Sequence, residues 1–127
     1  GEFNVEWVSI THSIPEPHAF VIRTSAGSVF HTADWKIDLA PVTDKPFNAH
    51  PFKLLGKQNI LAMVCDSTNA IREGHSVSEQ QCYKGLKQAV SKTKGRVVVG
   101  CFSSNIARLI TLAKIAKETG RYFALFG

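Results

Sequence analysis

The sequence lacks the signals that define several common classes of protein. No apolar run approaches the roughly 18–20 residues that a transmembrane helix needs. Neither glycine-rich phosphate loop, G-x-G-x-x-G or G-x-x-x-x-G-K-[ST], is present. No aromatic residues are interleaved with the lysines of the second half, so no stacking platform for single-stranded nucleic acid is visible. The sequence therefore predicts no membrane association and no common nucleotide-binding loop.

Cysteine is also scarce. The chain has three cysteines, Cys65, Cys82 and Cys101, and no C-x-x-C pair. This pattern argues against a disulfide framework and against a cysteine zinc site, and it is typical of a reducing, cytoplasmic compartment. Cys65 and Cys101 lie in apolar runs, so we expect them to be buried thiols.

The overall composition is that of a folded globular chain. Hydrophobic residues make up 44% and charged residues 20% of the 127 residues, a length that suits one small domain but is short for a two-domain enzyme. The net charge of +5 is compatible with a polyanionic partner such as nucleic acid. Many basic proteins bind no nucleic acid, so charge alone assigns no partner. The lysines of the two predicted helices lie on outer faces and indicate solvated surface.

The first part of the chain predicts strands. Residues 5–10 are rich in β-forming side chains and alternate loosely between apolar and polar. Residues 20–24 and 28–32 flank the short turn Ser25-Ala26-Gly27, which predicts a hairpin.

A loop that contains three prolines follows. Residues 38–58 include Pro41, Pro46 and Pro51, and we expect a short helix near residues 52–55. The apolar run over residues 60–65 then predicts a buried parallel strand.

Two helices are predicted in the second half. Ser76 and Glu79 have the spacing of a capping box, in which the serine caps the helix and the glutamate reaches back to its amide. We expect this first helix to end at Gly95. Its inner face would carry Tyr83, Leu86 and Val90.

The second helix is expected to begin after Ser103 or Ser104 and to end at Gly120. Residues 96–102 and 121–126 predict strands on either side of it. The resulting order β-α-β-α-β implies a parallel sheet with right-handed crossovers. The inner face of this helix would carry Ile106, Leu109, Ile110, Ala113 and Ala116.

Polar side chains follow the predicted strands, where ligands bind in sheets of this kind. His12 and Asp34 are candidate metal ligands, because imidazole and carboxylate both bind zinc at about 2.0–2.2 Å. Two ligands are fewer than the three or four that a zinc site requires. The competing interpretation is a polar loop histidine and a turn aspartate. His31 is the histidine best placed to support such a ligand, and we interpret His18, His50 and His75 as surface or interstrand residues.

Two further clusters admit a chemical and a structural interpretation. Ser103, Ser104 and Asn105 precede a helix, where free amides and the helix dipole favour a phosphate, but where capping alone also explains them. Asp66 either orients a histidine or forms an Asx-turn with the residues that follow it.

Five strings taken together resemble the ribonuclease J family. Each is similar to a family segment, and all occur in the family's order over most of residues 5–127. The strings are HSIPE at 12–16, HTADWKID at 31–38, CDSTNA at 65–70, SVSE at 76–79 and FSSNIAR at 102–108.

The resemblance implies a fold and a domain division. The chain would be α/β, with residues 1–72 forming the C-terminal portion of a metallo-β-lactamase αββα domain. Residues 73–127 would begin the parallel α/β β-CASP domain that is inserted into it. Both ends look cut, so we interpret the chain as an internal fragment.

The resemblance also implies site residues. His12 and Asp34 would be zinc ligands, with Asp34 bridging two ions, and Asp66 would support the catalytic centre. The family hydrolyses RNA by metal-activated water, as a 5′-to-3′ exonuclease and as an endonuclease, and the intact enzyme would be a homo-oligomer. The residues expected near RNA phosphates are Ser67, Thr68, Ser103, Ser104 and Asn105.

The sequence departs from the family pattern at several points. Ala33 and Ser103 stand where the family usually has glycine and alanine. The His-x-His-x-Asp-His motif of the metal centre is absent, so we expect this chain by itself to be inactive. Three alternatives stay open at this point: a β-CASP nuclease that acts on DNA, a non-catalytic phosphate- or nucleotide-binding module, and an inert structural fragment.

Overall fold

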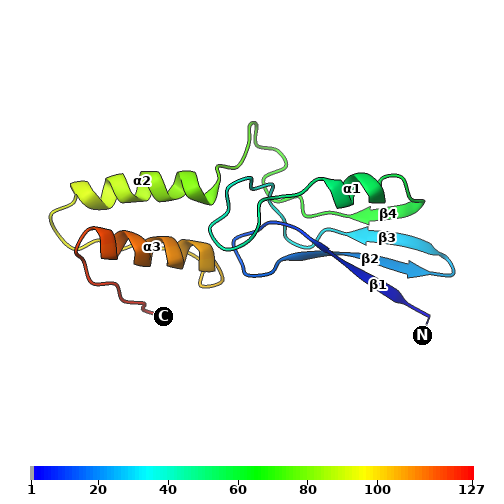
Figure 1. Ribbon diagram of the computed structural model, residues 1–127, viewed down its shortest axis with the longest axis horizontal. Coiled ribbons are helices and arrows are strands. Elements are labelled where there is room, and N and C mark those ends of the chain that lie inside the picture. The colour runs from blue at the N-terminus through cyan, green and yellow to red at the C-terminus, as the bar shows by residue number, and fades with distance from the viewer. Residues whose placement is uncertain (1) are drawn as a thin grey trace.

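The computed structural model describes residues 2–127. Figure 1 shows an elongated molecule with a sheet at one end, two long helices side by side at the other, and loops between them. None of the helices in the described part combines the length and apolar content needed to cross a membrane. The elements are β1 (Asn4–Ser9), β2 (His18–Thr24), β3 (Gly27–His31), α1 (His50–Leu55), β4 (Ile60–Val64), α2 (Glu79–Lys92) and α3 (Ile106–Glu118).

The predicted strands of the first part are confirmed. The sheet has the order β1-β2-β3-β4, with β1/β2 and β2/β3 antiparallel. The β2–β3 hairpin closes with Thr24 opposite Gly27. Gly27 has a φ of +141°, a conformation that side-chain-bearing residues rarely adopt, and this explains the glycine in the turn.

A small core lies under one face of the sheet. Val8, Ala19 and Val21 from the strands are buried against Leu55 of α1. Phe30 and Phe52 meet edge to face with ring centroids 6.0 Å apart. The short helix predicted near residues 52–55 is thus confirmed as α1, with Pro51 in its first turn.

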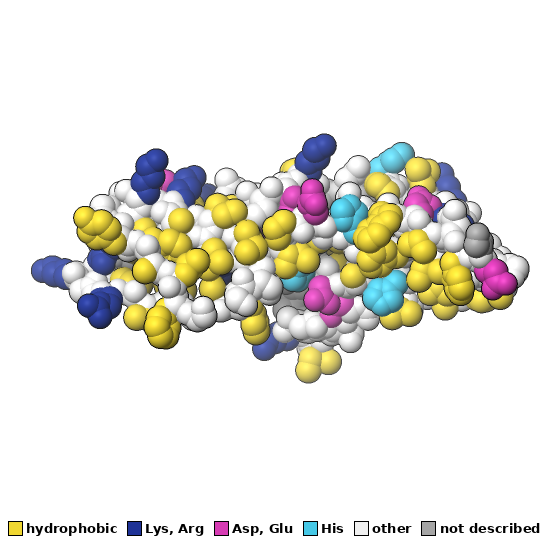
Figure 2. Space-filling view, turned by 90° about the horizontal axis from the view of Figure 1, so that it is seen from below, with side chains coloured by type: hydrophobic (Ala, Val, Ile, Leu, Met, Phe, Trp, Pro, Cys, Tyr) yellow, Lys and Arg dark blue, Asp and Glu magenta, His cyan; other side chains and the backbone are white. Residues whose placement is uncertain are grey.

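β4 is parallel to β3, as predicted, but the expectation that it is buried is wrong. Within residues 2–127 it is an edge strand, and Leu61 and Met63 are 70% and 61% exposed. The expectation of buried thiols at Cys65 and Cys101 is also wrong, because both side chains are exposed. The face that Figure 2 shows carries hydrophobic side chains along the whole molecule.

The capping box of α2 lies two residues later than predicted. Ser78 is the cap: its hydroxyl accepts from the Gln81 amide at 3.1 Å, and the Gln81 side chain accepts from the Ser78 amide at 3.1 Å. Ser76/Glu79 and Ser78/Gln81 have the same spacing, so the pattern fits both registers. The structure selects the second because the Glu79 side chain is buried in other contacts.

The C-terminus of α2 also differs from the prediction. The helix ends at Lys92, before Gly95, and the Thr93 hydroxyl donates to the Ala89 carbonyl at 3.0 Å. The Thr93 hydroxyl thereby satisfies one of the last-turn carbonyl groups, and Gly95 is not needed to end the helix.

The N-terminal cap of α3 and the face that it buries both differ from the prediction. Asn105, and neither Ser103 nor Ser104, is the cap: its side chain accepts from the Arg108 amide at 2.9 Å. Gly120 follows the helix with a φ of +65°, which confirms it as the terminating glycine.

The predicted inner face of α3 is correct at Ala116, half-buried at Ile106 and Leu109, and wrong at its other two positions. Ile110 is 45% exposed and Ala113 is also exposed. The helix is apolar on more than one side, so periodicity alone did not select the face that packs. The residues that it buries are Ala107, Thr111, Leu112, Ile115 and Ala116.

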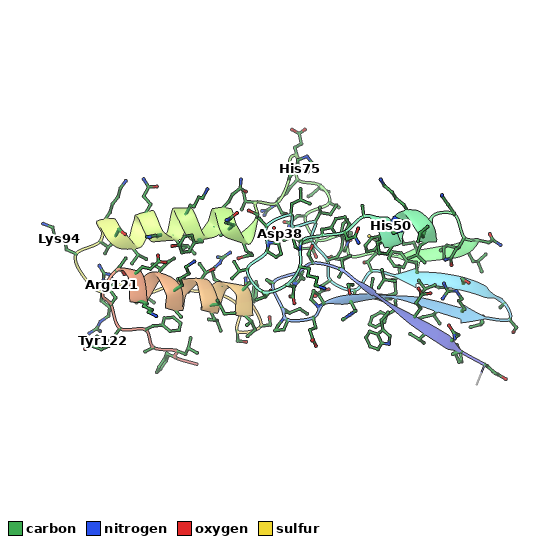
Figure 3. The ribbon with its side chains drawn as sticks, viewed as in Figure 1. Asp38, His50, His75, Lys94, Arg121 and Tyr122 are labelled. Carbon is green, nitrogen blue, oxygen red and sulfur yellow. The ribbon has the colours of Figure 1, made fainter. Side chains whose placement is uncertain are left out.

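The strands predicted at 96–102 and 121–126 do not form, so the predicted parallel β-α-β-α-β sheet is wrong. Both segments carry exposed apolar side chains, such as Val98 and Tyr122, and neither pairs with another strand within residues 2–127. A strand needs a neighbour for its backbone groups, and none is supplied there. Figure 3 shows Arg121 turned towards the α2–α3 connection, where it donates to the Gly95 carbonyl at 2.8 Å. The fold class is nevertheless mixed α/β, as predicted.

The hairpin turn generates a matched pair of substitutions. Gly27→Ala should lower the free energy of unfolding of the 127-residue chain by about 1–2 kcal/mol, because alanine is strained at this φ. Gly85→Ala, inside α2 with open space at the added methyl group, should raise it by about 0.5–1 kcal/mol. Denaturant unfolding of both variants checks this, and equal effects of the two substitutions would contradict the assigned turn.

Candidate functional site

The loop after β1 and the segment after β3 are bound together. The Lys36 amide donates to the Thr11 carbonyl at 2.8 Å, and the Asp38 amide donates to the Thr11 hydroxyl at 3.0 Å. The same hydroxyl donates to the Lys36 carbonyl. Thr11 is buried. His12, the next residue, is half-buried, and Asp34, which begins the bound segment, is exposed.

Asp66 lies against this pair of segments. Its amide donates to the Thr32 hydroxyl at 3.0 Å, and the indole nitrogen of Trp35 donates to its carbonyl at 3.3 Å. Residues 32 and 35 flank Asp34, so the end of β4 is fixed beside the segment that carries this carboxylate.

The Asp66 side chain forms the Asx-turn that was one of its two predicted roles. Its Oδ1 accepts from the Thr68 amide at 2.8 Å. Hydrogen bonds from the Thr68 side chain and amide, with a smaller contribution from Trp35, hold the pKa of Asp66 below its usual value against a smaller opposing effect of burial.

The start of α3 reaches the same loop. The Ala107 amide donates to the Ser13 carbonyl at 3.1 Å. Ser103 and Ser104 lie in the exposed turn just before the helix, whereas the Asn105 side chain is used as its cap. The loop after β1 therefore bonds both the start of α3 and the segment after β3, and that segment in turn bonds Asp66. Ser67 and Thr68, which follow Asp66, are exposed.

The metal-ligand set is incomplete within the described chain. Among residues 2–127, no three or more His, Cys, Asp or Glu side chains lie where they could hold one metal ion. His12 and Asp34 have the donor atoms that zinc prefers, but two donors do not make a zinc site. The chain alone does not fit the metal centre that the resemblance implies.

The remaining histidines lie apart from these two residues. The His31 ring accepts from the Ala33 amide at 3.0 Å and so supports the turn before Asp34. This bond is to the backbone and not to the side chain of either candidate metal ligand. His18 bonds the Glu16 carbonyl at 2.7 Å and meets Trp7 edge to face. His50 and His75 are exposed, and Figure 3 shows them on α1 and on the loop before α2.

A buried charged cluster, which sequence reasoning missed, joins the sheet to the helices. We call it the junction cluster; its members are Lys36, Asp38, Glu79 and Arg108. Lys36 Nζ lies 3.1 Å from Asp38 Oδ2 and 3.2 Å from Glu79 Oε1. Arg108 Nη2 lies 3.4 Å from Glu79 Oε2. Figure 3 shows Asp38 between the sheet and the helix pair.

The only sequence signal for this cluster was its place in the motifs. Lys36 and Asp38 end one of the five family-like strings, Glu79 ends another, and Arg108 ends a third. The sequence pattern predicts a capping-box role for Glu79 and no role for the other three, because pairs formed between distant segments leave no periodic pattern.

Asp38 is the most fully bonded member of the junction cluster. Burial by itself raises the pKa of its carboxyl group, but the amides of Glu79 at 2.9 Å and Ala40 at 2.8 Å, with the Lys36 ammonium, outweigh burial and lower the pKa overall. Through the Glu79 amide it also caps α2 from the sheet side, where the helix dipole favours a negative charge.

Comparison with known proteins identifies one group of relatives. No protein-family model matches the chain. It is 47% identical over all of its 127 residues to ribonuclease J of Sinorhizobium meliloti, covering 22% of that protein. It is 35% identical over its full length to ribonuclease J of Helicobacter pylori, covering 18%, and 34% identical over 125 residues to ribonuclease J of Thermus thermophilus, covering 22%. The chain thus spans about a fifth of the length of these relatives.

Ala33 generates a prediction at the turn before Asp34. It has a φ of +52°, in the left-handed region that glycine adopts freely. Ala33→Gly should therefore leave the site intact and raise the free energy of unfolding, or leave it unchanged, with a gain of at most about 1 kcal/mol. Denaturant unfolding measures this. A clear loss of stability would show that the left-handed turn is wrongly assigned.

The lowered pKa of Asp38 generates a prediction on pH. The stability that this carboxylate contributes is present above its unfolded pKa of about 3.9 and is lost as the pH falls through its lower folded pKa. Asp38→Asn should therefore destabilise the chain strongly at pH 7, and the difference from wild type should shrink below about pH 4. Unfolding curves from pH 7 to pH 2.5 check this, with Asp44→Asn as the control outside the cluster. A difference that does not change with pH would contradict the charged role of Asp38.

Proposed function

We propose that this chain, a segment of the ribonuclease J family, contributes to the active centre of a metal-dependent ribonuclease that hydrolyses RNA phosphodiesters. The observation that carries the proposal is similarity along the whole chain to proteins named ribonuclease J, combined with the meeting of the family-like strings at one place in the fold.

The proposal gives each of the meeting segments its own contribution. His12 and Asp34 would provide an imidazole and a carboxylate to a zinc centre that further residues of the parent protein complete, with two zinc ions in the intact enzyme. When bound, zinc would supply a water whose pKa is lowered from about 15.7 towards about 7. Asp66 would hold the strand end beside Asp34 through its bonds to Thr32 and Trp35.

The start of α3 is the proposed contact to the RNA backbone. Ser103 and Ser104 are exposed hydroxyl donors directly before a helix N-terminus, next to the His12 loop. Free amides and the helix dipole attract a phosphate there. Ser67 and Thr68 are exposed beside Asp66 and would extend this contact. The side-chain oxygen of Asn105 caps α3, so mainly its side-chain nitrogen, Nδ2, would be left to contact RNA.

The fold supports the proposed division near residue 72. The sheet ends at Val64 and α2 begins at Glu79, and the segment between them has no helix or strand. We assign residues 1–72 to a metallo-β-lactamase portion and residues 73–127 to a β-CASP portion. Within this proposal the parent enzyme acts both as a 5′-to-3′ exonuclease and as an endonuclease.

The metal ligands provide the test of this function. In the complete protein, His12→Ala and Asp34→Asn should each reduce RNA cleavage by more than about a hundredfold, since even groups that only support metal ligands contribute about 10–100-fold. Bound zinc should fall in the same variants. His75→Ala and Asp44→Asn are matched controls that should retain wild-type activity. The 127-residue chain alone should cleave no RNA with added zinc.

Cleavage of DNA but not of RNA of the same sequence would replace this proposal with a DNA-acting nuclease. Full activity and zinc content in both ligand variants would overturn the assignment of the site.

A further inference from the structure

We propose that the junction cluster is a charged latch that sets the orientation of the α2–α3 pair and so positions the Ser103–Ser104 turn against the His12 loop. Lys36, Asp38, Glu79 and Arg108 are then positioning residues. None of the four is among the candidate metal ligands or the candidate phosphate contacts. The consequence for RNA rests on the proposed function, whereas the consequence for geometry does not.

The contacts of the cluster run from one half of the molecule to the other. Lys36 and Asp38 belong to the segment bound to Thr11, on the sheet side. Glu79 is the first residue of α2, and Arg108 lies in the first turn of α3. Glu79 bonds both Lys36 and Arg108, so one carboxylate joins the sheet side to both helices.

Packing of elements does not fix this orientation. The strongest packing between helices and strands is among the four strands and between α2 and α3, so the sheet and the helix pair meet through the loops between them. An open hollow of about 410 Å³ is lined by the loop at residues 40–46 and by side chains of the two helices. The buried hydroxyl of Thr111, which also lines that hollow, has no hydrogen-bond partner in the described chain. The loop and the helices thus leave an open hollow and an unpartnered hydroxyl where they meet, while the charged side chains of the junction cluster contact one another directly.

Two backbone bonds accompany the latch. The Gln80 amide donates to the Ala40 carbonyl at 3.3 Å, and the Ala107 amide donates to the Ser13 carbonyl at 3.1 Å. Each lies next to a cluster residue on the helix side, Glu79 or Arg108. Both backbone bonds join the sheet side to a helix, so they form only when the helices are docked. In this proposal the charged contacts hold the helices docked and so allow the two bonds to form.

The burial of the cluster makes its charges mutually dependent. Asp38 and Glu79 are 2% and 4% exposed, whereas the Lys36 and Arg108 side chains are 18% and 23% exposed. Two carboxylates and two cations balance. Removal of one charge leaves its partner uncompensated in a buried place, which disfavours the docked arrangement far more strongly than loss of a surface pair.

The latch also links the two candidate binding regions. Asp34 lies at the start of the segment whose later residues, Lys36 and Asp38, hold the helices. The helix that Arg108 fixes begins directly after the Ser103–Ser104 turn. Loss of the latch should therefore move the phosphate contact relative to Asp34 while leaving both groups chemically intact.

Distance measurements in the complete protein test the latch directly. Spin labels at Ser25→Cys in the hairpin turn and Gln88→Cys on α2, with native cysteines replaced by serine, report the separation of the two halves. Wild type should give one narrow distance distribution. Glu79→Gln should broaden or shift it. Arg108→Met provides a second variant if Glu79→Gln fails to fold.

The matched control is Lys87→Met. Lys87 pairs with Glu118 at 2.8 Å between α2 and α3, within the helical half, and their side chains are 44% and 30% exposed, so its loss should leave the distribution unchanged. A wild-type distribution in both Glu79→Gln and Arg108→Met would overturn the latch.

Kinetics add a second readout. The KM for a 5′-phosphorylated RNA should rise about tenfold in Glu79→Gln, within the usual range of coupling between sites, while kcat changes less. An unchanged KM together with a broadened distribution would remove the positioning role. If wild type cleaves no RNA, the proposed function fails, and the distance measurement still decides the latch.

Discussion

The arrangement of this molecule depends on how the carboxylates of Asp38 and Glu79 are neutralised where the sheet meets the helices. Both are buried, and an ionised carboxylate in such a place needs cations and hydrogen-bond donors. Lys36 lies between them, Arg108 contacts Glu79, and two backbone amides bond Asp38. These donors come from opposite halves of the chain, so the charges are satisfied only when the halves are docked. The need to neutralise the buried carboxylates therefore also fixes how the sheet side and the helices are oriented.

That requirement extends into the candidate site. Thr11 holds the segment that contains Lys36 and Asp38, and the next residue after Thr11 is His12. The same segment begins at Asp34, and its Trp35 ring fixes the carbonyl of Asp66. The candidate ligands and the supports of the junction are therefore neighbours in one short stretch of chain, which explains why they fall in the same family-like strings.

Local pattern was sufficient to predict elements that depend on local chemistry. The β2–β3 hairpin, α1, the parallel β4 and the presence of α2 and α3 follow from turn residues, a proline and apolar periodicity. It was insufficient where two registers satisfy the same rule, as at Ser76 and Ser78. It also did not identify the buried face of α3, whose side chains are apolar on several sides, or the failure of residues 96–102 to form a strand without a neighbour. His12, Asp34, Asp66 and the start of α3 were named from sequence, but the junction cluster required coordinates because its members are up to 72 residues apart.

The most direct test of this account is the hydrogen exchange of the Ala107 amide in the complete protein when Lys36 is replaced by methionine. That amide bonds the Ser13 carbonyl, and the Lys36 side chain forms its ion pairs with Asp38 and Glu79 instead. If buried charge holds the halves together, Lys36→Met should accelerate exchange at Ala107 while amides in the middle of α3 stay protected. Unchanged protection at Ala107 would show that the docking of the helices does not depend on the junction cluster.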